Sequence, residues 1–213
     1  MSEALRVTGR AFRLWWGQML LFMVLNLAWL ALQIPIVTGP AATAAMYVVA
    51  RRAADGELVG PRDAWRALRA MLWPALGWGA LNLLLAVVIC VNFIVYGSAA
   101  GIVWSALRLA WGTLATLWFA MNLFYWPFWL AQTDRRLVLA FRNALLLYLK
   151  APGFGLTLLL LCTALIIVSV LVTLPLAVAL MSWLALIGVL AVDSALHRPQ
   201  SVAPDMGVEL DVL

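Results

Sequence analysis

Residues 151–192 read APGFGLTLLLLCTALIIVSVLVTLPLAVALMSWLALIGVLAV, a run of 42 residues without one charged side chain. Three further uncharged runs occupy residues 14–50, 70–107 and 109–133. The hydrocarbon core of a bilayer is about 30 Å thick and needs about 20 consecutive apolar residues for each helical crossing. We therefore expect an all-α fold, a polytopic helical bundle in a membrane, with little of the chain left for a soluble domain.

The composition of the whole chain supports this class. Of its 213 residues, 66% are hydrophobic and 11% are charged, whereas about 25% of the residues of a soluble domain are charged. The net charge is +5, but the basic residues border the apolar runs, as in membrane proteins that follow the positive-inside bias. No nucleic-acid recognition motif is present. We expect the lipid bilayer as the surroundings and no nucleic acid as a partner.

Proline and glycine divide the longest runs, since both residues weaken or end a helix. Breaks are expected around Pro35 and Pro40, between Gly97 and Gly101, and at Pro175. The prediction is a single transmembrane helical domain, residues 1–198, followed by a flexible cytoplasmic tail, residues 199–213. The domain is expected to contain six membrane helices, over residues 13–34, 39–53, 71–95, 103–131, 153–172 and 175–195.

The first two predicted spans differ from the others in length. The first is interpreted as a retained membrane helix, because its apolar run is more than twice as long as the core of a signal peptide. The second makes a helix only about 22 Å long, so it is either a full crossing of a thinned region or a re-entrant half-helix. Thr38 is predicted to cap its start through the hydroxyl, and Pro40 to occupy its first turn.

The positive charges give the predicted bundle a direction. With six crossings, every Lys and Arg except Arg108 falls on the same side as both termini. The positive-inside rule makes that side the cytoplasm. On it, residues 61–72 and 134–149 each place arginines and apolar side chains on different helical faces. We expect two interfacial amphipathic helices there, with docking on a partner subunit as the alternative.

An aromatic side chain recurs every seven residues in the fourth predicted span, from Trp104 to Tyr125. This spacing is typical of a packing seam between helices. The alternatives are a row of flat platforms for a carbohydrate or an acyl chain, and side chains that simply face the lipid. Arg108 lies one turn from two of these rings, where it makes a cation–π contact, snorkels to the interface or binds an anion. The start of the second helix is a further candidate, because a half-helix N-terminus attracts anions. The predicted ligand-binding residues are Trp104, Arg108, Trp111, Trp118, Thr38 and Gly39.

Motifs for catalysis, phosphate binding or metal binding are not visible in this sequence. It shows no carboxylate pair, nucleophile–base set, phosphate-binding loop or cluster of metal ligands, and His197 is its only histidine. We therefore expect no catalytic residue, no cofactor and no metal. Amides inside the spans are expected to pair across helices or to line a cavity, with pairing favoured, because a bare amide in hydrocarbon is costly. These amides are Asn26, Gln33, Asn82, Asn92 and Asn122.

Residues 26–47 read NLAWLALQIPIVTGPAATAAMY. This stretch resembles the opening signature of the YesL-like family of small bacterial membrane proteins, whose function is unknown. The family pattern is an Asn and a Trp in the first helix, then Pro-x-x-Thr, Gly-Pro and Ala-Thr-Ala-Ala, and here it begins at Asn26 and Trp29. The chain departs from the family at Arg69-Ala70, where a Lys-Asn pair is frequent. Genes of that family often lie beside genes for sugar ABC transporters, so the resemblance implies an accessory role in carbohydrate uptake.

Three functions are therefore kept as hypotheses. The first is a non-enzymatic accessory subunit of a larger membrane complex, such as a carbohydrate ABC importer, with a membrane protein as its partner. The second is a small stand-alone transporter or channel that works as a homo-oligomer. The third is a structural subunit of an energy-converting membrane complex.

Overall fold

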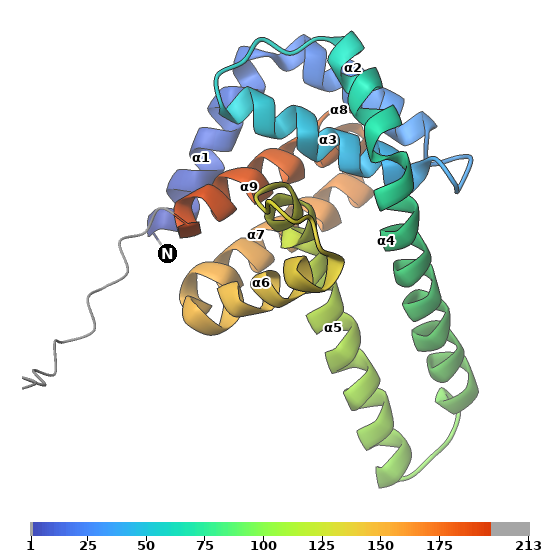
Figure 1. The fold of residues 1–213 in the computed structure, drawn as a ribbon. Coiled ribbons are helices and arrows are strands. Elements are labelled where there is room, and N and C mark those ends of the chain that lie inside the picture. Colours follow the sequence, from blue (N-terminus) through green and yellow to red (C-terminus); the bar gives the residue numbers. More distant parts are fainter. Residues whose placement is uncertain (1, 197–213) are drawn as a thin grey trace, which may run out of the picture.

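A computed structural model describes residues 2–196 of the chain, and all of its regular structure there is helical (Figure 1). The prediction of an all-α fold is confirmed for this part. His197, Arg198 and the predicted tail, residues 199–213, lie outside the described residues. The nine helices are α1 (Ser2–Gly17), α2 (Met19–Ala31), α3 (Gly39–Ala54), α4 (Pro61–Tyr96), α5 (Ile102–Leu130), α6 (Leu137–Lys150), α7 (Pro152–Val172), α8 (Leu174–Val178) and α9 (Leu180–Leu196).

Three of these helices are long and apolar enough to cross a membrane, namely α4, α5 and α7. The pair α1 and α2 passes the same test when taken together, although its two halves are bent by 96°. The helix α9 is apolar but shorter. The described chain therefore contains three or four candidate membrane spans. Their length and apolar composition are those of a membrane protein.

The first predicted span, residues 13–34, is not one helix. The chain turns sharply at Gln18, so residues 13–17 belong to α1 and the helix that follows is α2. The indole nitrogen of Trp15 donates a hydrogen bond to Ser182 Oγ at 3.1 Å, which fastens the end of α1 to α9. The turn is thus accompanied by a contact between residues 167 positions apart in the chain.

The other boundaries agree with the prediction to different degrees. The predicted spans 39–53, 103–131 and 153–172 correspond closely to α3, α5 and α7. Residues 61–72 form no separate helix, because α4 continues without a break through Pro74; membrane helices tolerate an internal proline when neighbouring groups satisfy the freed carbonyl. The predicted span 175–195 is divided at Ala179 into α8 and α9.

The core lies where α1, α3, α5 and α9 meet, and α9 is buried along most of its length. The helix α3 brings a face of buried alanines, and α4 packs beside it. Small residues let two helix backbones approach closely. At Gly79 of α4, a Cβ atom would lie 2.5 Å from Pro40 Cγ of α3, so only glycine fits without movement. Beyond this crossing, α4 and α5 extend together as a hairpin away from the other helices (Figure 1).

The side chain of Asn26 in α2 forms hydrogen bonds on both sides of the break between α8 and α9. Its side-chain nitrogen donates to the carbonyl oxygens of Leu176 and Ala177, both at 2.8 Å. Its side-chain oxygen accepts from the backbone nitrogens of Met181 at 2.8 Å and Ser182 at 3.2 Å. One fully buried amide therefore satisfies backbone groups at the end of α8 and at the start of α9, the groups that helix ends leave without partners. The expected pairing of Asn26 across helices is confirmed.

Candidate functional site

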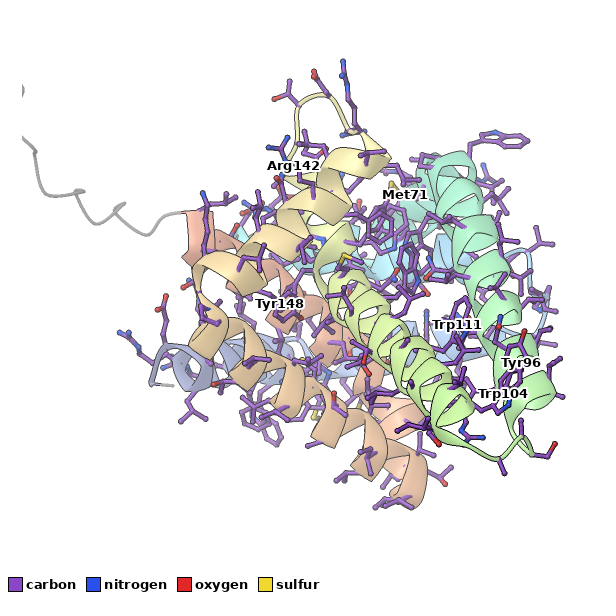
Figure 2. The ribbon with its side chains drawn as sticks, turned by 90° about the horizontal axis from the view of Figure 1, so that it is seen from below. Met71, Tyr96, Trp104, Trp111, Arg142 and Tyr148 are labelled. Atoms are coloured by element: carbon purple, nitrogen blue, oxygen red, sulfur yellow. The ribbon has the colours of Figure 1, made fainter. Side chains whose placement is uncertain are left out.

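The predicted aromatic row lies on α5 inside the α4–α5 hairpin. Figure 2 shows Trp104 and Trp111 on the side of α5 that faces α4, with Tyr96 of α4 close to Trp104. The side chain of Trp104 is 37% exposed, and those of Trp111 and Trp118 are half-buried. The hairpin is therefore the place where a ligand platform would have to form.

Four side chains join the two arms of the hairpin, and we call them the Trp–Asn clasp: Trp78 and Asn82 of α4, Trp118 and Asn122 of α5. Trp78 Nε1 donates to Asn122 Oδ1 at 2.8 Å, and Trp118 Nε1 donates to Asn82 Oδ1 at 2.9 Å. Each asparagine then donates to the carbonyl oxygen of the tryptophan on its own helix, at 2.9 Å. The antiparallel helices thus exchange equivalent bonds, and the predicted pairing of both asparagines across helices is confirmed.

Two of the predicted platforms are already stacked on protein rings. Trp104 lies 5.0 Å from Tyr96 with an interplanar angle of 22°, and Trp118 lies 4.7 Å from Phe141 of α6 with an angle of 26°. Among residues 2–196, no ring contact of this kind involves Trp111. The packing-seam interpretation therefore fits Trp104 and Trp118, while Trp111 is the one ring of the three left for a ligand.

Arg108 closes the tip of the hairpin. One terminal nitrogen donates to the carbonyl oxygens of Tyr96 at 2.9 Å, Gly97 at 3.2 Å and Ala99 at 3.0 Å, and the other donates to Ser105 Oγ at 3.1 Å. Carbonyls at a helix C-terminus lack partners and carry partial negative charge. The guanidinium therefore caps α4, and of the three alternatives considered for it the cation–π contact is not made in the described chain.

A groove of about 790 Å³ runs along α5 between α4, α6 and α7. Its lining is mostly apolar, and the hydroxyls of Thr113 and Thr116 donate to carbonyls of their own helix. At one end, Tyr148 donates to the carbonyl oxygen of Ala120 at 3.0 Å. Burial raises the pKa of Tyr148, and Cys162 adds to the shift, so the phenol stays protonated and keeps this bond. Such a lining suits an acyl chain better than a sugar, which needs polar partners.

Thr38 and Gly39 lie apart from the aromatic row, in the turn between α2 and α3. The Thr38 hydroxyl donates to the carbonyls of Leu32 at 2.7 Å and Pro35 at 2.9 Å, so it closes the end of α2. The predicted hydroxyl cap on α3 is wrong, whereas Pro40 does occupy the first turn as predicted. Gly39 is buried and its carbonyl accepts from Gln33 at 3.5 Å. The six predicted residues therefore do not form one site.

The two remaining predicted amides, Asn92 and Gln33, differ in their partners. Asn92 donates to the carbonyl of Val88, one turn earlier in α4, at 2.8 Å. Gln33 donates to the carbonyl of Trp29, one turn earlier in the chain, at 3.2 Å. Asn92 does not make the expected pairing across helices in the described chain, because its side chain reaches a carbonyl of its own helix. Gln33 does make it, since it also donates to the carbonyl of Gly39 at the start of α3, at 3.5 Å.

Sequence reasoning missed a charged cleft of about 580 Å³ where α1, α3 and α9 meet. Arg51 of α3 forms ion pairs with Asp193 of α9 and, at 3.2 Å, with Asp55. Ser194 donates a hydrogen bond to Glu3 of α1. In the sequence, the signs of this cleft are Asp193 at the end of the last apolar run and Arg51 and Arg52 near the end of α3. Only the fold shows that these two helix ends are neighbours.

Comparison with known proteins relates one part of the chain to a family. Residues 22–93 match a family described as a protein of unknown function, DUF624. The matched segment begins in α2 and ends within α4, so it includes Asn26 and the resemblance noted at residues 26–47, and α5–α9 lie outside it. No curated protein and no solved structure matches the chain.

Proposed function

We propose that the protein is a non-enzymatic, multi-pass protein of the bacterial inner membrane that acts as an accessory subunit of a larger membrane complex. A carbohydrate ABC importer is the complex that the family resemblance suggests. The observation that carries the proposal is the α4–α5 hairpin, in which the most apolar stretch of each helix has no buried residue.

The hairpin exposes apolar side chains along both of its helices. In α4 and in α5, no residue of the most apolar 18-residue stretch is buried. In the corresponding stretch of α7, 22% of the residues are buried. Leu84 is 63% exposed, Ile94 78% and Leu109 72%. A large exposed apolar surface marks a contact with lipid or with another protein. In a membrane, this arm is the part of the chain best suited to lie between the helices of a partner.

The polar groups of the hairpin favour an accessory subunit over a transporter. The Trp–Asn clasp uses its amides and indoles internally, and Arg108 is bound to the end of α4. A transport site at the middle of the membrane presents polar groups or broken backbone to its substrate. In the described chain the break at Ala179 is instead closed by Asn26.

The proposed topology has six crossings, formed by α2, α3, α4, α5, α7 and the α8–α9 pair, with both termini in the cytoplasm. The ion pairs of Arg51 with Asp193 and of Arg52 with Asp63 bring the ends of α3 and α9 and the start of α4 together. These ends carry the excess of arginine that the positive-inside rule assigns to the cytoplasm. Thr38→Cys should then react with a thiol reagent added from outside only. Labelling from the cytoplasmic side would contradict a full crossing by α3.

Photo-crosslinking in native membranes tests the accessory role. A photoreactive amino acid is placed at Leu84 or Ile94 on the hairpin, and at Leu160 of α7, which is 69% exposed, as a matched control. The proposal expects a defined crosslinked protein band from the hairpin positions and lipid adducts from the control. Lipid adducts at all three positions would contradict it. A crosslinked dimer of this chain would instead support the homo-oligomeric transporter, to be tested by solute flux in proteoliposomes.

A further inference from the structure

The helix α1 presents three different faces along its length. One face is buried against α9 and carries Ala4, Val7, Ala11 and Trp15, at the spacing of one side of a helix. Trp15 anchors this face through its hydrogen bond to Ser182. The remaining two faces are exposed, and they differ sharply in chemistry.

The second face is an apolar stripe. Leu5 is 54% exposed, Phe12 43% and Trp16 62%, and their spacing of seven and four residues places them in one line. The rings of Phe12 and Trp16 lie 5.8 Å apart. An exposed line of two aromatic rings and a leucine is costly in water. It is favourable where the side chains reach the boundary of the acyl chains.

The third face carries three arginines, Arg6, Arg10 and Arg13. All three are exposed, and their spacing of four and three residues again places them in one line, next to the apolar stripe. In residues 2–196 none of them forms an ion pair, whereas Arg51, Arg52 and Arg136 each pair with an acid. Arg6 and Arg10 also line the charged cleft between α1, α3 and α9, but both stay exposed there. The row of three exposed positive charges is complementary to a surface of negative charge.

The direction of α1 fits these faces to a membrane surface. The bend of 96° at Gln18 sets α1 almost at right angles to α2. The helix α2 is strongly apolar, with Leu20 at 74% and Val24 at 56% exposure. When α2 points into the bilayer, α1 therefore lies along its surface, with one face on the protein, one towards acyl chains and one towards head groups.

We propose that α1 is a binding site for anionic phospholipids at the cytoplasmic surface of the membrane. Leu5, Phe12 and Trp16 enter the boundary between head groups and acyl chains, and the arginine row binds the lipid phosphates. The chemistry is charge attraction combined with shallow insertion of rings. This site requires only that the chain lies in a membrane, so it does not depend on the accessory role proposed above.

Spin labels measure the depth of each face in reconstituted vesicles of phosphatidylglycerol and phosphatidylcholine. In a background with both cysteines replaced, Trp16→Cys is labelled on the apolar stripe and Arg10→Cys on the arginine row. The proposal expects the label at position 16 to be relaxed by oxygen, which concentrates among acyl chains. The label at position 10 should be relaxed by a water-soluble nickel complex. Protection of both positions from both reagents would mean that protein covers α1, and would overturn the proposal.

Lipid selectivity tests the role of charge. The triple variant Arg6→Gln, Arg10→Gln and Arg13→Gln is compared with Arg52→Gln, Arg135→Gln and Arg136→Gln, which removes the same charge from arginines bound to protein groups. The readout is the preference for spin-labelled phosphatidylglycerol over phosphatidylcholine at low salt.

One arginine near an anionic surface contributes a factor of about five. The α1 variant removes three such arginines, so its preference should fall by at least about fivefold, or vanish if the preference of the unchanged protein is smaller than that. The control variant should keep most of the preference. Circular dichroism and size exclusion check that both variants fold. An equal preference in the two variants would overturn the proposal.

Discussion

Replacing Asn26 by leucine tests how the broken α8–α9 segment is held. The two side chains have the same branching and the same number of heavy atoms, so the change removes hydrogen bonds without leaving a large cavity. Four bonds are lost, to two carbonyl oxygens and two backbone nitrogens. At about 0.6 kcal/mol for each bond inside a membrane protein, the loss is about 2.4 kcal/mol. Burial of unsatisfied backbone groups raises the expected range to about 2–4 kcal/mol.

The assay is reversible unfolding in mixed micelles of dodecyl sulfate and a non-ionic detergent, followed by tryptophan fluorescence. Asn92→Leu is the matched control, because Asn92 bonds only to a carbonyl of its own helix in the described structure. The control should change the free energy of unfolding by less than about 0.5 kcal/mol. Equal effects of the two substitutions would refute the claim that Asn26 fastens α2 to the break.

Three further predictions concern the helix hairpin and its packing. Gly79→Ala should destabilise the protein by about 1–3 kcal/mol, because the added methyl meets α3; Gly77→Ala, which meets nothing within 4 Å, should stabilise it by up to about 1 kcal/mol. In a double-mutant cycle of Trp78→Phe and Asn122→Leu, the coupling energy should be about 0.6–1.7 kcal/mol, and additive effects would argue against the clasp. Arg108→Gln should speed hydrogen exchange at the tip of the hairpin while leaving the overall melting temperature nearly unchanged; unchanged exchange there would show that the cap is dispensable.

The sequence predicts best where one local signal is enough. The start of α3 follows from Gly39 and Pro40, and the long uncharged runs give α5 and α7 to within a residue at each end. The turn at Gln18 follows Gly17, a helix-weakening residue that is not among the predicted breaks. The bond from Trp15 to Ser182 of α9, which accompanies the bend, has no signal in the sequence. The break at Ala179 likewise takes its partners from Asn26, a residue far away in the sequence.

In the candidate site, too, local patterns could be predicted and contacts between distant residues could not. The heptad spacing correctly puts the tryptophans on one side of α5, but it cannot name the rings that stack on them, since Tyr96 comes from α4 and Phe141 from α6. For Arg108 the spacing left a cation–π contact, snorkelling and anion binding as alternatives, and it binds carbonyls because the tip of the hairpin brings the end of α4 within its reach. Contacts between elements distant in the sequence therefore decide which predicted residues remain available for a ligand.

The most direct test of the accessory role is native mass spectrometry of the protein extracted from its own membranes in a polymer nanodisc. The account predicts a complex in which this chain is present in fixed ratio with other membrane subunits, and the masses of those subunits name the complex. A particle that contains this chain alone, as a monomer or as a homo-oligomer, would contradict the accessory role.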